Sequence, residues 1–271
     1  MTVDLDKLAF AMREVAEQVI MPRFRKLSAD QIEEKAKDDF VTVADKEAEE
    51  LLTPILLDLA PGSIVVGEEA TAANPDLLEN VKTDGAVWYV DPIDGTSLFI
   101  EGKPDFGTMI AYAEKGEVVQ SAIFLPVVDE LFLAERGAGA FLINADGETI
   151  RLQPRKGPAA VSEARAALYT RHFPSSWDEK LERLRAQVKS ARNAMSSAKE
   201  YTDIARGAKE LATYHRMLPW DHAPGSLILR EAGGVVRNLE TEQDYKPVHL
   251  QGPHVLASNE DLWQAARRVM R

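Results

Sequence analysis

The sequence predicts an α+β protein, and three observations along the chain support this fold class. Near the N-terminus, apolar side chains follow the three- and four-residue spacing of one helix face: Leu5, Leu8, Met12, Val15 and Val19. Residues 106–152 have the pattern of several antiparallel strands separated by turns that contain glycine. After residue 158, predicted strands and helices alternate, which is typical of an α/β unit.

The elements of the first half can be placed from their apolar patterns and from proline. The first helix is expected to end at Pro22. A second helix should begin near Asp45, and Pro54 inside it predicts a kink or a break. Two short buried strands should follow, at Ile64–Val66 and Ala86–Val90. The first half therefore combines two long helices with an antiparallel-rich sheet.

The segment Gln153–Pro158 is polar, with two prolines and a glycine. It predicts a boundary between an N-terminal domain, residues 1–153, and a C-terminal domain, residues 154–271. Strands of the second domain are expected at Ala166–Tyr169, Ala212–His215 and Val235–Val236. Its helices are expected at Trp177–Val188, Ser196–Arg206, Ala223–Ala232 and Asn259–Val269. Ser258 and Asp261 are placed like a capping box for the last helix.

The composition excludes several classes of protein. The 271 residues include 44 Asp and Glu, 32 Lys and Arg, and no Cys, for a net charge of −12. Without Cys there is no thiolate zinc site, iron–sulfur cluster or cysteine nucleophile. The acidic balance disfavours nucleic acid as a partner. The apolar stretches are too short to span a bilayer and the start lacks a signal-peptide pattern, so we expect a cytoplasmic protein without a membrane partner.

Acidic residues follow predicted strands or open a helix at three places: Glu68 and Glu69, Asp91 and Asp94, and Asp221. A single acid in such a place is usually a helix cap or part of a solvated turn. Three such places in one chain indicate a cation site, because crowded carboxylates repel one another unless a cation neutralises them. Oxygen ligands without paired His favour Mg²⁺, with Mn²⁺ as a possible substitute, over Zn²⁺.

The segment Asp91–Thr96, with the sequence Asp-Pro-Ile-Asp-Gly-Thr, is the sharpest of these places. Pro92 stiffens the chain between two acids, and Gly95 lets the backbone approach a ligand closely. Gly95 and Thr96 would then open a short helical turn whose N–H groups can hold phosphate. An ordinary Asp-Pro turn with an Asp-Gly corner remains the alternative.

Four blocks of sequence resemble the inositol monophosphatase family of Mg²⁺-dependent, lithium-sensitive phosphatases. The blocks are, in order, Asp39-Phe40-Val41-Thr42 through Asp45; Gly67-Glu68-Glu69; Asp91 through Thr96; and Trp220 through Gly225 followed by Glu231-Ala232-Gly233-Gly234. The resemblance covers residues 5–265. It implies a layered α-β-α-β-α sandwich like that of fructose-1,6-bisphosphatase, a site between the two halves, and a homodimer.

The resemblance also implies which residues hold metal. Glu68, Asp91 and the backbone carbonyl of Ile93 would hold the first Mg²⁺ ion. Asp91 would bridge to a second ion, which Asp94 and Asp221 complete. Glu68 would also face a third, weaker ion through water molecules, so two to three ions are expected. One metal ion would activate water while another stabilises the leaving alkoxide.

Catalytic and phosphate-binding roles follow from the same resemblance. Thr96 and Asp45 would orient the attacking water on the first metal, so Asp45, Glu68 and Thr96 are the predicted catalytic residues. The amides of Gly95 and Thr96 would bind the phosphate. For Asp45, the alternative is the N-cap of its helix, and both roles can hold together.

Contacts to the rest of the substrate are predicted at Asp94, Ser197, Tyr214 and Asp221. Inositol-specific members of the family carry a Glu that binds the inositol ring, and alignment from the Trp-Asp block places Tyr214 there instead. His215, Arg216 and Lys103 are further candidate contacts. For these three residues, as for Tyr214, an exposed surface position is the alternative. His222 is expected to be a partly exposed polar residue rather than a ligand.

Together these features predict a metal-dependent phosphoric monoester hydrolase of the inositol-phosphate phosphatase type. Its substrate would be a small polyol or sugar phosphate such as inositol 1-phosphate. Alternatives with the same mechanism are histidinol phosphate, which residues 97–108 favour by resemblance, fructose 1,6-bisphosphate and a 3′-phosphonucleotide. An alternative from another class is a regulatory protein that binds the transcription or ribosome-maturation machinery.

Overall fold

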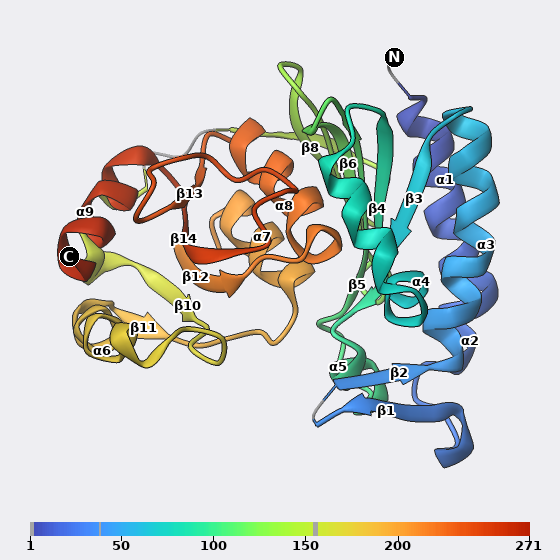
Figure 1. Cartoon of the computed structure of the whole chain (residues 1–271), viewed down its shortest axis with the longest axis horizontal. Helices are drawn as coiled ribbons and strands as arrows, with labels where there is room; N and C mark the ends of the chain where they lie inside the picture. The colour runs from blue at the N-terminus through green and yellow to red at the C-terminus, as the bar shows by residue number, and fades with distance from the viewer. Residues whose placement is uncertain (1–2, 38, 154–156) are drawn as a thin grey trace.

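The helices and sheets form five layers in the order α, β, α, β, α (Figure 1). The structure is a computed structural model that describes residues 3–37, 39–153 and 157–271. From one outer side to the other, the layers are two long helices, a seven-stranded sheet, a middle pair of helices, a five-stranded sheet and a last pair of helices. The predicted layered α+β fold is therefore confirmed.

The seven-stranded sheet has the strand order β3-β4-β5-β6-β7-β8-β9. Its strands are β3 (Ile64–Gly67), β4 (Ala86–Asp94), β5 (Gly107–Glu114), β6 (Glu117–Leu125), β7 (Glu130–Glu135), β8 (Gly139–Ile143) and β9 (Thr149–Leu152). β3 and β4 are parallel, and the other neighbours pair antiparallel. β4 extends beyond its predicted end at Val90 because Asp94 still pairs with Gly107 of β5. The acidic segment thus begins inside the sheet.

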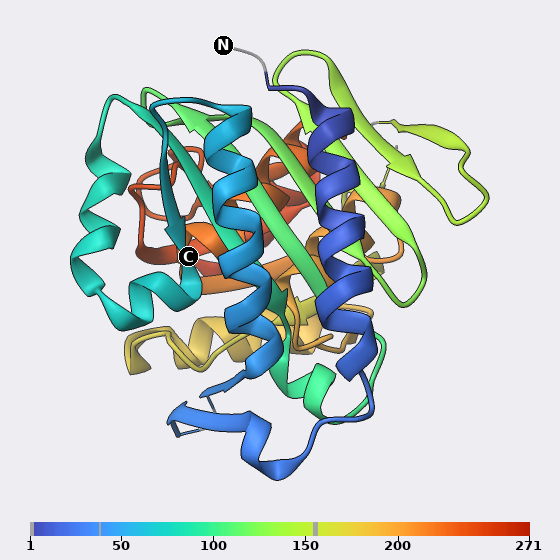
Figure 2. The ribbon, with the colours of Figure 1, turned by 90° about the vertical axis from the view of Figure 1, so that its right-hand side faces the viewer.

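Two long helices cover the outer face of this sheet (Figure 2). They are α1 (Leu5–Val15), continued by a π-helical turn (Ala16–Ile20) and α2 (Met21–Arg23), and α3 (Val43–Leu59). The break expected at Pro54 does not occur, since α3 runs through it. Pro54 and Glu50, one turn earlier, are both exposed, so water can reach the carbonyl that the proline leaves without a partner.

Several short elements lie near the site, and of these only the helical turn opened by Gly95 and Thr96 was predicted. A hairpin of β1 (Ile32–Ala36) and β2 (Asp39–Thr42) precedes α3, after a 3₁₀ turn at Ala29–Gln31. α4 (Glu68–Ala73) and a 3₁₀ helix (Pro75–Lys82) lie between β3 and β4, and α5 (Thr96–Ile100) follows β4. β1 and α4 consist largely of charged or small residues, so neither helical nor strand periodicity identifies them.

The five-stranded sheet has the order β11-β10-β12-β14-β13. Its strands are β10 (Arg165–Leu168), β11 (Ser190–Ala191), β12 (Leu211–Arg216), β13 (Val235–Asn238) and β14 (Gln251–Ala257). The surrounding helices are α6 (Asp178–Gln187), α7 (Ser197–Arg206), α8 (Pro219–Glu231) and α9 (Glu260–Met270), with 3₁₀ turns at Val161–Glu163 and Ser175–Trp177. β14 was not predicted, because Gly252 and Pro253 interrupt its apolar run.

The predicted capping box of the last helix is wrong in its register. The N-cap of α9 is Asn259, whose side-chain oxygen accepts the amide of Leu262, and not Ser258. Asn is as good an N-cap as Ser, so the sequence pattern alone could not separate the two residues. α8 also begins at Pro219, four residues before its predicted start, because proline is well tolerated in the first turn of a helix.

One apolar core joins the two halves of the chain. Along β4, Val87 and Tyr89 face the middle helices, whereas Trp88 and Val90 face α1 and α3. The cluster that contains Tyr89 also contains residues of α7, α8 and the five-stranded sheet. The sheets divide between Leu152 and Arg165, and residues 154–156 of the predicted domain boundary lie outside the described residues. The division into two domains stays a prediction.

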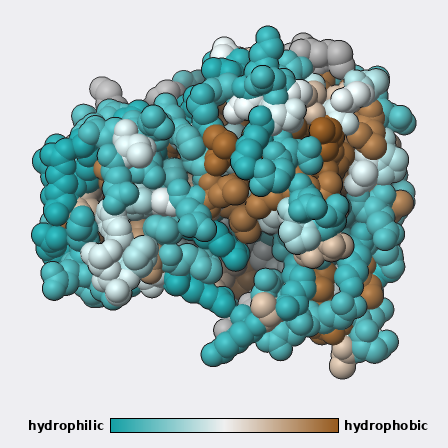
Figure 3. All heavy atoms as spheres, in the orientation of Figure 1, coloured by the Kyte–Doolittle hydropathy of each residue, from teal (hydrophilic) through white to brown (hydrophobic). Residues whose placement is uncertain are grey.

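The face of the molecule drawn in Figure 3 is mostly hydrophilic, with apolar residues gathered near its middle. None of the helices in the described part of the chain is long and apolar enough to cross a membrane.

Candidate active site

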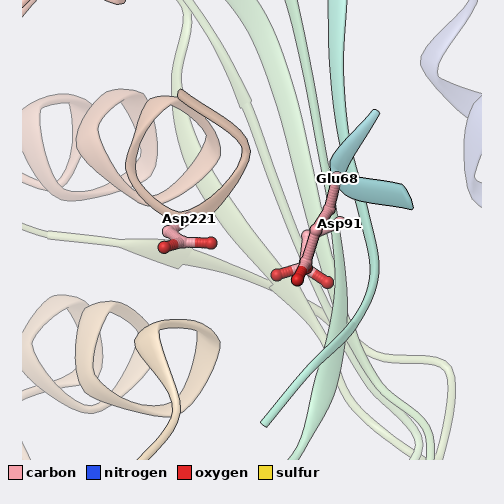
Figure 4. Close-up of side chains that lie close together, drawn as sticks. All are labelled: Glu68, Asp91 and Asp221. Atoms are coloured by element: carbon pink, nitrogen blue, oxygen red, sulfur yellow. The ribbon is translucent and has the colours of Figure 1, made fainter. Parts of the chain in front are cut away.

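Three acidic side chains from distant parts of the chain meet between the seven-stranded sheet and α8. Asp91 lies near the end of β4, Glu68 begins α4, and Asp221 lies in the first turn of α8. Carboxylate oxygens of the three residues all lie within 4.8 Å of one another. Figure 4 shows them pointing toward a common space, Asp221 from one side and the other two from the opposite side. We call these residues the acidic cluster.

The electrostatics of the acidic cluster favour a cation. Asp91 is only 2% exposed, and burial, followed by repulsion from Glu68, raises its pKa well above the ordinary value. Burial and repulsion from Glu68 likewise raise the pKa of Asp221. All the ligand atoms are carboxylate oxygens, which suits a hard divalent cation such as Mg²⁺. The residues present therefore fit the predicted metal chemistry.

Asp94 is turned toward the start of α7. Its carboxylate accepts hydrogen bonds from the Ser196 hydroxyl, from the amide of Ser197 at 3.1 Å and from the amide of Ala198 at 2.8 Å. Burial raises the pKa of Asp94 to about 6, although these hydrogen bonds favour its charged form. Asp94 is not part of the acidic cluster, so its role as a metal ligand stays a prediction.

Asp45 and Thr96, the predicted pair for orienting water, are in contact. The Thr96 hydroxyl lies 3.2 Å from an Asp45 carboxylate oxygen and 3.1 Å from the carbonyl oxygen of Ile93. The other Asp45 oxygen accepts the amide of Thr42 at 2.8 Å and the Thr42 hydroxyl at 2.5 Å. Thr42 is therefore the N-cap of α3, and Asp45 completes the capping box rather than being the cap itself.

Gly95 has the backbone conformation that its predicted role requires. Its φ of 91° lies in the left-handed region, and it precedes the first residue of α5. A Cβ at this position would lie 3.2 Å from the Cβ of Ser196. The first amides of a helix have no acceptor within the helix, so those of Gly95 and Thr96 are suitable donors to an anion.

Lys35 contacts the acidic cluster, and sequence reasoning missed it. Its ammonium group on β1 lies 2.9 Å from a Glu68 oxygen and 3.0 Å from a Glu69 oxygen. Burial and repulsion from Glu68 raise the pKa of Glu69 to about 7. Lys35 stands in a run of charged residues without a motif, so no local signal marks it. In this structure it supplies positive charge to the carboxylates.

Glu49 is a second residue that sequence reasoning missed. It is 5% exposed and accepts the amides of Glu69 at 2.9 Å and Ala70 at 2.8 Å, which fixes the start of α4. A Cβ on Gly67 would lie 2.3 Å from the Glu49 carboxyl carbon, so only glycine allows this approach. An acid between Ala48 and Leu52, two residues of the buried helix face, was the signal that could have revealed it.

A cavity of about 200 Å³ adjoins Asp94 and Asp221. The four predicted substrate contacts all line it: Asp94, Ser197, Tyr214 and Asp221. His215 and Arg216 line it as well. Tyr214 is 7% exposed, which overturns the alternative of an exposed surface position for this residue. Lys103 is exposed and pairs with Glu101 instead.

His222 is buried, and the prediction of a partly exposed residue is wrong. Only 1% of it is exposed, because the early start of α8 places it on the inner side of that helix. Its Nδ1 lies 3.1 Å from the Tyr201 hydroxyl, and its Nε2 lies 3.1 Å from the Arg216 carbonyl oxygen. Burial lowers the pKa of His222 to about 3, so the ring is neutral. That His222 is not a metal ligand stays a prediction.

Comparison with known proteins identifies this arrangement. The sequence profile of the inositol monophosphatase family matches residues 3–270. The chain belongs to this family. An inositol-1-monophosphatase from Rhizobium meliloti (strain 1021) is 33% identical over 247 residues, which cover 89% of this chain and 86% of that protein. The Nus factor SuhB of Vibrio cholerae is 32% identical over 230 residues, which cover 84% and 81%.

Solved structures of the inositol monophosphatase family share the five-layered fold. The structure of an inositol monophosphatase from Thermotoga maritima superposes with a TM-score of 0.78 at 25% identity, and the match covers 98% of this chain and 96% of that one. This chain is therefore a phosphatase of the family, a metal-dependent group of hydrolases that act on small phosphorylated substrates. Among the described residues, the acidic cluster is a group that could hold a metal ion.

Proposed function

We propose that this chain is a Mg²⁺-dependent phosphomonoesterase that hydrolyses a small polyol or sugar phosphate with metal-activated water. The acidic cluster carries the proposal, because its oxygens converge within 4.8 Å beside a cavity large enough for a small leaving group. Carboxylates this close are stable together when a cation neutralises them. Mg²⁺ is the proposed ion, and Mn²⁺ can replace it at such oxygen sites.

The proposed ligands follow the family pattern. Glu68, Asp91 and the Ile93 carbonyl would hold one ion, and Asp91, Asp94 and Asp221 would hold a second. A third would be bound more weakly through water next to Glu68. Bound metal would lower the pKa of a coordinated water and stabilise charge on the leaving oxygen. The Ile93 amide donates to Asp91 at 3.1 Å, which helps to hold that carboxylate in place.

Asp45 and Thr96 would orient the attacking water. When the Thr96 hydroxyl donates to Asp45, its lone pairs remain available to accept a hydrogen bond from that water. Asp45 is itself held by two hydrogen bonds from Thr42, so the pair is positioned before substrate arrives. The amides of Gly95 and Thr96 would bind the phosphate oxygens as charge develops on them.

The leaving group would occupy the cavity beside the acidic cluster. Asp94, Ser197, Tyr214 and Asp221 line it, which supports their proposed contacts with substrate. We also propose inhibition by millimolar Li⁺, a homodimeric assembly and a cytoplasmic location. These three follow from the family resemblance and from the composition.

Phosphate release from a panel of phosphomonoesters tests the proposal. Inositol 1-phosphate, histidinol phosphate, fructose 1,6-bisphosphate, adenosine 3′,5′-bisphosphate and glycerol 2-phosphate would each be incubated with Mg²⁺ or with EDTA. We expect turnover with Mg²⁺, none with EDTA, and recovery when Mg²⁺ is restored. Release that is indifferent to EDTA would contradict the metal-dependent mechanism.

A regulatory role is the second candidate, since a relative at 32% identity carries the name Nus factor SuhB. It would require a surface that binds transcription or ribosome-maturation proteins. An Asp94→Asn variant that loses phosphatase activity, yet retains a stoichiometric protein partner and its cellular function, would favour this candidate. Loss of cellular function together with activity would favour the enzyme.

A further inference from the structure

Arg216 is an unpaired cation beside the acidic cluster. It ends β12 and is exposed, and it lines the cavity together with Asp94 and Asp221. Within residues 3–37, 39–153 and 157–271, its guanidinium forms no hydrogen bond and no ion pair. Other arginines of the chain, such as Arg165 and Arg237, do pair with carboxylates. The chain has a net charge of −12, so carboxylates are plentiful. An arginine at the substrate cavity that pairs with none of those described is available to bind an anionic ligand.

Further hydrogen-bond donors surround Arg216. Arg171, His172 and His215 line the same cavity. Burial, followed by the positive charge of Arg216, lowers the pKa of His172, and burial lowers that of His215. Both imidazoles are therefore neutral near pH 7 and can donate N–H hydrogen bonds. The wall of the cavity thus combines guanidinium charge with neutral donors.

The backbone of Arg216 is held in a fixed relation to the acidic cluster. Its carbonyl oxygen accepts the Nε2–H of His222, and the Tyr201 hydroxyl donates to the opposite ring nitrogen, each at 3.1 Å. Burial keeps His222 neutral, which is the state that this chain of hydrogen bonds requires. Only four residues separate Arg216 from Asp221, and the charge of Arg216 opposes the rise in the pKa of Asp221.

Among the described residues that line this cavity, Asp94 and Asp221 are the carboxylates, and both are proposed metal ligands. Tyr214 occupies the position where the family resemblance places the glutamate of inositol-specific members. Its ring is buried and stacks on Tyr169 with centroids 4.7 Å apart. A neutral polyol therefore loses an acceptor for its hydroxyl groups here. A negatively charged leaving group meets cations and N–H donors instead.

We propose that Arg216 is a specificity-determining residue that binds a second anionic group on the substrate. The preferred substrates would be small phosphomonoesters that carry a further phosphate or carboxylate a few bonds from the scissile phosphate. A guanidinium binds either anion through paired N–H donors. This inference rests on the proposed function and narrows its substrate class.

Matched pairs of substrates test the inference. Fructose 1,6-bisphosphate would be compared with fructose 1-phosphate, and 2-phosphoglycerate with glycerol 2-phosphate, as kcat/KM in Mg²⁺. We expect the doubly anionic member of at least one pair to be preferred by roughly 10- to 100-fold, the range of a charge-assisted hydrogen bond. Preference in the first pair alone indicates a second phosphate, and preference in the second pair indicates a carboxylate.

The variant Arg216→Gln should reduce that preference to about threefold or less, mainly through a higher KM for the doubly anionic member. Arg216→Lys should retain part of the preference because it keeps the charge. Arg183→Gln removes an exposed arginine on α6, outside the cavity. This control should leave unchanged both the preference and the KM for the doubly anionic member. Melting temperatures of all variants would show that each is folded.

Two results would overturn the inference while leaving the proposed function intact. One is a wild-type enzyme that hydrolyses both members of each pair equally well. The other is a preference that persists in Arg216→Gln. If no compound of either pair or of the wider panel releases phosphate in Mg²⁺, the proposed function itself fails, and the inference fails with it.

Discussion

Replacing Asp221 with Asn should stabilise the metal-free protein and remove its response to Mg²⁺. Without metal, the oxygens of Glu68, Asp91 and Asp221 lie within 4.8 Å of one another, so the ionised groups repel. Asn has nearly the same shape as Asp but carries no charge. The substitution therefore relieves the repulsion, which stabilises the metal-free protein. It also deletes a proposed metal ligand, which removes the stabilisation that Mg²⁺ binding would give.

The size of this stabilisation of the metal-free protein follows from the distance between the carboxylate oxygens. Two unit charges 4.8 Å apart repel by about 3 kcal/mol at an effective dielectric constant near 20. Proton uptake by Asp91 and the nearby Lys35 and Arg216 charges reduce this penalty in the wild type. We therefore expect a gain of about 1–3 kcal/mol in the free energy of unfolding, or roughly 3–10 °C in Tm for a chain of this size.

The stability of the metal-free wild type should fall as pH rises. Burial raises the pKa of Asp91 and Asp221 above the ordinary value of 3.8, and that of Asp94 to about 6. Between the unfolded and folded pKa values, the folded protein holds protons that the unfolded chain has released. Its stability therefore falls as pH rises from about 4 through the raised pKa values of the folded state, of which that of Asp94 is about 6. In EDTA the wild type should melt higher at pH 5 than at pH 8, and Asp221→Asn should show a smaller difference.

Circular dichroism melting in EDTA and in MgCl₂ at pH 8 measures both effects, and calorimetric titration measures Mg²⁺ binding directly. We expect Mg²⁺ to raise the Tm of the wild type but not of Asp221→Asn. Asp58→Asn is the matched control, because Asp58 is exposed and far from the acidic cluster along α3. The reasoning is refuted if Asp221→Asn melts lower than the wild type in EDTA, or if its Tm still rises with Mg²⁺.

Three further predictions concern catalysis, capping and packing. Thr96→Val, like Asp45→Asn, should lower kcat by roughly 100-fold or more while calorimetric Mg²⁺ binding persists; near-normal kcat would exclude the proposed water-orienting pair. Glu49→Ala should reduce stability by about 1–2 kcal/mol in urea unfolding, because the first amides of α4 lose their acceptor, and Glu49→Gln should cost less. Gly225→Ala would place a Cβ 2.1 Å from Cγ of Tyr201, so it should destabilise the protein by about 1–3 kcal/mol or more; an unchanged Tm would show that α7 and α8 can separate.

Local patterns predicted elements well where one face of a helix or strand is buried. The N-terminal helix and the antiparallel strands of residues 107–152 were placed correctly, because their periodicity reflects burial against the sheet and the helices. Prediction failed where neighbouring layers decide the outcome. α8 begins before its apolar pattern does, and β14 forms because it pairs with both β12 and β13.

The residues of the candidate site were likewise predicted where a local pattern marks them and missed where distant contacts decide their role. Asp91 and Asp221 were predicted because they stand in recognisable blocks of sequence. Lys35 and Glu49 were missed because each acts on a residue that is distant in the chain, Lys35 on Glu68 and Glu49 on the amides of α4. His222 was misplaced because its burial depends on the layers on both sides of α8.

The sequence by itself determined the chemistry of the ligands, since oxygen donors without Cys or paired His admit hard cations and exclude thiolate sites. It also indicated the helical turn after Asp94, where glycine permits the left-handed conformation that Gly95 adopts. The tertiary structure alone decided that Glu68, Asp91 and Asp221 meet, and that Arg216 lies beside them without an ion pair to any described residue. These arrangements depend on how α8 packs against the seven-stranded sheet, and contacts between such distant segments leave no periodic pattern in the chain.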